Sequence, residues 1–121
     1  MRTAAQPSAV KPSPPSDGAT ELSVQPDPRG APWVAIETVG FGAATLDLRS
    51  APDLTGPWGA QSPVYTPPES QRSGVLVYAG KGHPELSGAP FVANYASNST
   101  TFSTLVADTS LYYPRFVRIS P

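Results

Sequence analysis

The only histidine of the chain, His83, stands two residues before Glu85, and this pair is the part of the sequence best suited to chemistry. An imidazole titrates near neutral pH, and a neighbouring carboxylate can orient it or exchange protons with it. In an extended strand the two side chains would share one face about 7 Å apart, with Pro84 tolerated at a strand edge. The spacing indicates a general acid–base or metal-linked pair. The alternative is a histidine that hydrogen-bonds a turn beside a solvated glutamate.

Two other acidic residues, Glu37 and Asp47, fall on expected strands. Exposed strand faces carry such charges routinely, so we expect both to be solvated. Arg115 and Arg118 fall on opposite faces of the last expected strand, so they form no shared anion clamp. Because nothing in the sequence places a second carboxylate opposite Glu85, no catalytic residue is assigned.

Composition limits the class of protein. The 121 residues, 12.6 kDa, fit one domain, and 16 prolines break the chain into short elements. A net charge of −1 with 14% charged residues argues against nucleic acid or an anionic membrane as a partner. The absence of cysteine excludes disulfides and thiolate chemistry. No apolar run approaches the roughly 20 residues of a spanning helix, and no signal peptide is recognised.

Short apolar stretches between turn residues predict an antiparallel all-β fold. Alternation is clearest at 44–49, where two leucines share one face, and 33–39 is rich in aromatic and β-branched residues. The segment 105–108 is ambiguous. The expected strands are 22–24, 33–39, 44–49, 62–66, 75–79, 91–96 and 111–119.

The chain divides into a flexible, disordered N-terminal tail and one β domain. Residues 1–19 are rich in proline, alanine and serine and cannot bury enough apolar surface to become ordered. Within residues 20–121, Gly-Ala-Pro-Trp-Val-Ala at 30–35 returns as Gly-Ala-Pro-Phe-Val-Ala at 88–93. The recurrence is close to the roughly 50 residues of a propeller blade, which indicates two blades, about 20–70 and 73–121.

Two blades cannot close a ring, because propellers have four to eight. Each blade would leave an apolar face without its neighbour. The chain is therefore a piece of a longer protein, a unit that self-associates through its exposed blade faces, or a small sandwich of the same strands.

Three segments carry a resemblance to a known family: 77–87 (Val-Tyr-Ala-Gly-Lys-Gly-His-Pro-Glu-Leu-Ser), 91–98 (Phe-Val-Ala-Asn-Tyr-Ala-Ser-Asn) and 111–118 (Leu-Tyr-Tyr-Pro-Arg-Phe-Val-Arg). They resemble the end of bacterial five-bladed β-propeller proteins similar to glycoside hydrolase family 43 and to related propeller domains of uncharacterised function. Residues 46–51 through Gly-Pro-Trp at 56–58 resemble the penultimate blade. The likeness spans roughly residues 20–121.

The resemblance implies a partial propeller from a carbohydrate-active protein, with a polysaccharide or oligosaccharide as partner. His83 and Glu85 would line the central channel or bind substrate, and Tyr95 and Tyr113 would stack on sugar rings. For the aromatic residues, core packing between blades is the alternative. No cofactor is expected from the chain itself, although the channel of a complete propeller could hold a metal ion. The longer protein would be extracellular.

The resemblance leaves the activity open. The early blades, which would carry most of the acidic catalytic residues, are absent from this sequence, so we do not expect the chain to be catalytically complete alone. The alternatives are a non-catalytic glycan-binding or structural propeller module and a truncated gene product without an independent function.

Overall fold

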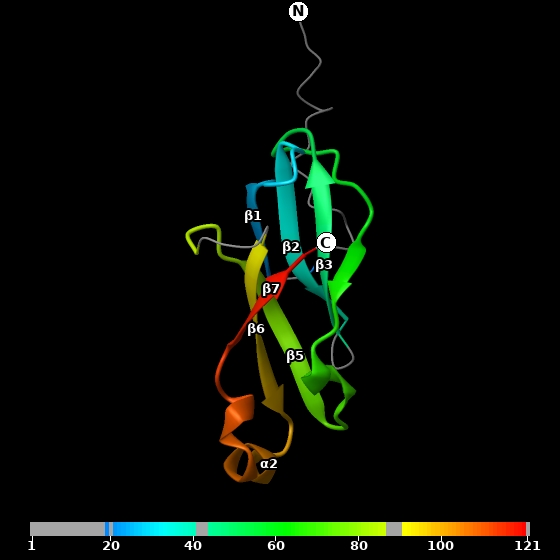
Figure 1. Cartoon of the computed structure of the whole chain (residues 1–121). Coiled ribbons are helices and arrows are strands. Elements are labelled where there is room, and N and C mark those ends of the chain that lie inside the picture. The colour runs from blue at the N-terminus through cyan, green and yellow to red at the C-terminus, as the bar shows by residue number, and fades with distance from the viewer. Residues whose placement is uncertain (1–18, 20, 41–43, 87–90, 121) are drawn as a thin grey trace, which may run out of the picture.

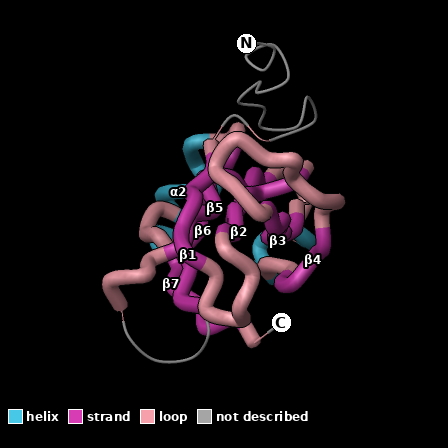
Figure 2. The backbone as a smooth tube through the Cα atoms, turned by 90° about the horizontal axis from the view of Figure 1, so that it is seen from above, coloured by secondary structure: helices cyan, strands magenta, loops and turns pink. Residues whose placement is uncertain are grey.

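A computed structural model describes residues 19, 21–40, 44–86 and 91–120. The first sheet contains four antiparallel strands in the order in which they follow along the chain (Figure 1). These are β1 (Leu22–Pro26), β2 (Trp33–Val39), β3 (Thr45–Ala51) and β4 (Ser62–Tyr65). Viewed from above, the same order runs from one side of the molecule to the other (Figure 2).

The second sheet contains three antiparallel strands, again in chain order: β5 (Val75–Gly82), β6 (Phe91–Ser99) and β7 (Arg115–Ile119). The 3-10 helix η1 (Pro68–Gln71) connects the sheets, and α2 (Phe102–Ala107) and η2 (Thr109–Leu111) connect β6 to β7. Helix α2 lies at the end of the second sheet that points away from the first (Figure 1). Among the described residues, no helix has the length and apolar character needed to cross a membrane.

The antiparallel all-β prediction is confirmed, with corrections at individual elements. The ambiguous segment 105–108 mostly belongs to α2, and the last strand begins at Arg115 rather than at residue 111. Pro114, which lacks an N–H, stands immediately before the shortened strand. The tail 1–18, the turn at 41–43 and the repeated residues 88–90 lie outside the described residues.

The two sheets enclose one apolar core. Val34, Ile36, Leu46 and Leu48 of the first sheet pack with side chains of the second sheet. The contributors from the second sheet are Val77, Phe91, Ala93, Tyr95 and Ile119. Because each strand pairs with its neighbour in sequence within its own sheet, the described strands form two successive meanders. This order differs from that of an immunoglobulin sandwich.

Strand β5 joins the sheets through two glycines. The N–H of Gly80 donates to Thr38 Oγ1 at 2.6 Å, and the N–H of Gly82 donates to Ser23 Oγ at 2.7 Å. A Cβ on Gly80 would come within 2.5 Å of Leu46 and Thr38 side-chain atoms. Only glycine allows the β5 backbone to approach the first sheet this closely.

An irregularity in β5 sets which residues face outward. The register against β6 shifts between Tyr78 and Lys81, and Ala79 has a positive φ of 58°. Val75 and Val77 are buried before this bulge and Gly80 is buried after it, so the alternation changes phase by one residue. The bulge therefore places Lys81 on the side of the sheet opposite the glycines.

Candidate functional site

His83 directly follows β5 and begins a tight turn. Its carbonyl accepts from the N–H of Leu86 at 3.0 Å, and its own N–H donates to the carbonyl of Val92 at 2.7 Å. Pro84 takes the second position of this turn, where its fixed φ is favoured. The expectation of an extended strand through residues 83–85 is wrong; the turn, rather than strand alternation, brings His83 and Glu85 together.

The imidazole of His83 makes two side-chain hydrogen bonds. Nδ1 lies 2.8 Å from Glu85 Oε2, and Nε2 lies 2.8 Å from Asn94 Oδ1. Both partner atoms are acceptors, so the geometry favours the doubly protonated imidazolium. The bond to Glu85, followed by the bond to Asn94, raises the pKa of His83 above its ordinary 6.5. The same bond lowers the pKa of Glu85 below its ordinary 4.5, which keeps the carboxylate ionised at neutral pH.

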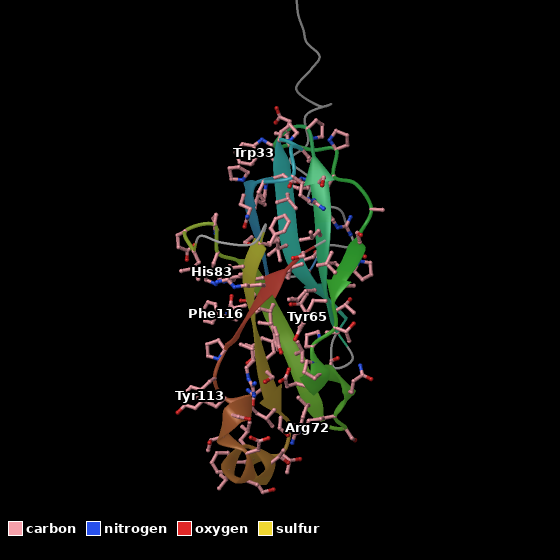
Figure 3. All side chains as sticks on the ribbon, in the orientation of Figure 1. Trp33, Tyr65, Arg72, His83, Tyr113 and Phe116 are labelled. Carbon is pink, nitrogen blue, oxygen red and sulfur yellow. The ribbon has the colours of Figure 1, made fainter. Side chains whose placement is uncertain are left out.

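The ring of Phe116 lies beside this pair. Its centroid is 5.1 Å from that of His83, with 46° between the ring planes, and the two side chains are neighbours in Figure 3. Phe116 is opposite Asn94 in the β6–β7 register and is 56% exposed. An apolar ring thus stands open to solvent next to an ionised carboxylate.

A pocket of about 460 Å³ opens at this corner of the second sheet. Its walls come from the turn after β5 and from β6 and β7: Glu85, Leu86, Val92, Phe116, Val117 and Arg118. Glu85 is the one carboxylate on these walls, as far as the described residues go. The pocket therefore combines an acceptor, a guanidinium and an apolar surface.

The site is a poor match for a metal ion. Within the described ranges, no three His, Cys, Asp or Glu residues come together in a way that could hold one. His83 would have to give up its bond to Glu85 or to Asn94 before a ring nitrogen could act as a ligand. The described side chains at this position therefore do not offer a ligand set for a metal ion.

The two tyrosines considered for sugar stacking occupy opposite environments. Tyr95 is 2% exposed in the core, its ring centroid is 6.1 Å from that of Tyr65, and its hydroxyl donates to Glu69 Oε1 at 2.5 Å. Burial, together with that bond, raises the pKa of Tyr95 well above its usual range. Sugar stacking and core packing were the two roles predicted for Tyr95, and its burial supports core packing.

Tyr113 is 63% exposed and makes an edge contact with Tyr112. It lies further along the second sheet toward α2 than His83 and Phe116 do (Figure 3). Tyr113 is therefore accessible, but it does not line the pocket.

The prediction that Glu37 and Asp47 are solvated is wrong. Glu37 is 1% exposed and Asp47 is 3% exposed. Glu37 Oε1 accepts from Arg49 Nε at 2.7 Å, and Asp47 Oδ1 accepts from Thr45 Oγ1 at 2.6 Å. Both carboxylates serve internal polar contacts of the first sheet, away from the pocket.

The sequence analysis did not select Asn94 or Phe116 for the site, and it considered Arg118 only as part of a clamp with Arg115. Alternation along β7 separates Arg118 from Arg115, as expected, and the strand register places Phe116 and Arg118 on one face with Asn94 and Val92. The signal available in the sequence was this two-residue spacing. The position of Phe116 and Arg118 near His83 depends on strand pairing, which the two-residue spacing does not predict.

Comparison of the chain with family models, with curated proteins and with solved structures finds no match.

Proposed function

We propose that this chain is the carbohydrate-binding part of a five-bladed β-propeller similar to glycoside hydrolase family 43, and that a saccharide binds at the His83–Glu85 corner. One observation carries the proposal: the Glu85 carboxylate, hydrogen-bonded to the imidazole of His83, borders a pocket beside an exposed aromatic ring.

These groups suit a sugar because a sugar has both polar and apolar surfaces. The carboxylate of Glu85 can accept hydrogen bonds from hydroxyl groups, and the ring of Phe116 offers flat apolar area to the C–H face. His83 uses its two nitrogens to hold Glu85 and Asn94 in place. It acts as a positioning residue rather than as a proton donor to the ligand.

The arrangement of the sheets supports the propeller part of the proposal. Propeller blades are antiparallel sheets of about four strands that follow one another along the chain. Here the first strand of one meander, β1, and the first strand of the next, β5, are joined by the bond from Gly82 to Ser23. If each first strand borders the central channel, the turn that carries His83 lies at one end of a channel-lining strand.

The presence of a single carboxylate at the pocket, within the described part of the chain, favours binding over hydrolysis by this chain alone. Glycoside hydrolysis uses two carboxyl groups, about 5 Å apart for retention or about 6.5–9.5 Å apart for inversion. Among the described residues only Glu85 reaches the pocket. Its lowered pKa also makes it a poor proton donor at neutral pH. A complete extracellular protein with further blades would have to supply the second group.

The test is binding of the full 121-residue chain to a panel of polysaccharides, measured by retardation in native gels and by calorimetry. We expect Glu85→Gln and Phe116→Ala each to weaken binding about tenfold or more. Glu21→Gln and Tyr113→Ala are matched controls, because both residues are exposed and neither lines the pocket.

Two outcomes would contradict the proposal. Binding that is equally sensitive to Tyr113→Ala and insensitive to Phe116→Ala would place the site elsewhere. Hydrolysis of aryl glycosides by the purified chain, lost in Glu85→Gln, would replace the binding function with a catalytic one.

A further inference from the structure

We propose that the saccharide bound at this corner is acidic, with a uronic acid carboxylate that pairs with Arg118. The inference rests on the proposed function, because it names the class of sugar that the same pocket takes. Over the described part of the chain, most cations are paired with an acidic side chain, and the unpaired ones lie near this pocket.

Four of the six described lysine and arginine side chains have an acidic partner within 4 Å. These pairs are Arg29 with Asp27, Arg49 with Glu37, Arg72 with Asp108, and Arg115 with Glu69. Arg118 and Lys81 have no such partner among the described residues, and both are exposed. The other four described arginines are thus paired within the chain, and the charges of Arg118 and Lys81 remain available.

The two unpaired cations lie on the same face of the second sheet. Lys81 is opposite Asn94, which is opposite Phe116, so these three residues form one row across the strands. Val92 is hydrogen-bonded to His83 and is opposite Arg118, which forms the next row. With about 4.8 Å between strands and about 3.4 Å per residue, the Lys81 and Arg118 backbones are roughly 12 Å apart.

Arg118 is the cation that the ligand would meet directly, because it lines the pocket with Glu85 and Phe116. A guanidinium binds a carboxylate in a two-pronged, charge-assisted arrangement. Lys81 is more distant and adds attraction along the sheet.

The negative charge of Glu85 does not cancel the preference of the pocket for an acidic sugar. The Glu85 carboxylate is hydrogen-bonded to His83 Nδ1 at 2.8 Å, so one of its oxygens is occupied within the chain, while the Arg118 guanidinium and the Lys81 ammonium have no acidic partner among the described residues. The pocket therefore has two distinct polar ends: Glu85 for hydroxyl groups and Arg118 for a carboxylate.

The experiment compares the binding of uronate polymers with the binding of a polymer that has the same sugar backbone but no charged carboxylates. The full chain is tested against polygalacturonate, alginate and hyaluronate, against polygalacturonate whose carboxyls are methyl-esterified, and against dextran sulfate as a general polyanion. We expect at least one uronate polymer to bind, and esterification to remove most of the affinity of polygalacturonate if that is the polymer bound. For the polymer that binds, Arg118→Gln should weaken binding about tenfold and Lys81→Gln two- to threefold.

Arg72→Gln is the matched control, because it removes one exposed arginine charge outside the pocket. Circular dichroism and the unfolding midpoint of each variant establish that the fold is retained. If Arg72→Gln weakens binding as much as Arg118→Gln, or if dextran sulfate binds as tightly as the uronates, the attraction is general and the inference is overturned.

The remaining outcomes separate this inference from the proposed function. Binding of a neutral polysaccharide that requires Glu85 and Phe116 but not Arg118 would overturn the acidic specificity and leave the proposed function standing. Absence of binding to any polysaccharide would overturn both.

Discussion

Two of the acid–base pairs among the described residues have nearly equal lengths and opposite surroundings. In the first sheet, Glu37 and Arg49 are joined at 2.7 Å with side chains 1% and 5% exposed. At the end of β5, His83 and Glu85 are joined at 2.8 Å with side chains 25% and 64% exposed. Distance alone does not distinguish them, so burial must decide what each pair does.

Burial makes the first pair structural and leaves the second available. Glu37 also accepts from the Ala19 N–H and from Gln61 Nε2, so its carboxylate is satisfied from within the chain. Removing one partner of a buried pair leaves an uncompensated charge in a medium that solvates it badly. Glu85, in contrast, keeps most of its surface in water and can exchange water for a ligand.

The largest expected effect is the loss of the buried pair. Glu37→Gln should lower the free energy of unfolding by about 3–5 kcal/mol, because the substitution breaks the ion pair with Arg49 in a buried environment. Urea denaturation at pH 7 measures this, and Glu85→Gln is the exposed counterpart, for which we expect a midpoint close to that of the parent chain. Equal losses of unfolding free energy in Glu37→Gln and Glu85→Gln would show that burial does not distinguish the two pairs.

A second comparison uses the two tyrosines. Tyr95→Phe removes the donor to the buried Glu69 carboxylate and should cost about 1–3 kcal/mol. Tyr113→Phe changes an exposed hydroxyl and should stay within about 0.5 kcal/mol of the parent chain. If thermal unfolding shows the larger loss in Tyr113→Phe, the assignment of Tyr95 to core packing fails.

The smallest effect is the pH dependence of the exposed pair. The raised pKa of His83 stabilises the fold at pH values below its unfolded 6.5, and this contribution is lost as the pH rises through the folded value. The lowered pKa of Glu85 stabilises the fold above 4.5, and this contribution is lost as the pH falls through the folded value. The pair should therefore contribute most between about pH 4.5 and 6.5.

NMR titration can test this directly, because the chain has one histidine and therefore one imidazole Cε1–H signal. The midpoint should lie above 6.5 and should move down in Glu85→Gln. A smaller downward shift is expected in Asn94→Ala, since the bond to Asn94 is the second cause of the raised pKa. A midpoint that does not respond to Glu85→Gln would show that the two side chains are not bonded in solution.

The site was only partly predictable from the sequence, for reasons visible at particular residues. The importance of His83 and Glu85 follows from their chemistry and spacing, but the spacing was interpreted as a strand although the chain makes a turn there. Glu37 was expected in water because alternation predicts two faces for a strand without showing that both are covered. Phe116 was not selected because its neighbour His83 is distant in sequence.

By itself, the sequence determined the antiparallel all-β character of the chain and the residue types of the polar pair, because alternation, β-branched residues and prolines act locally. Tertiary structure alone decided which polar side chains are buried and which groups meet at the pocket. The bulge at Ala79 changes the phase of β5, and pairing with β6 and β7 brings Asn94 and Phe116 to His83. Both depend on contacts between distant segments, and local periodicity contains no information about such contacts.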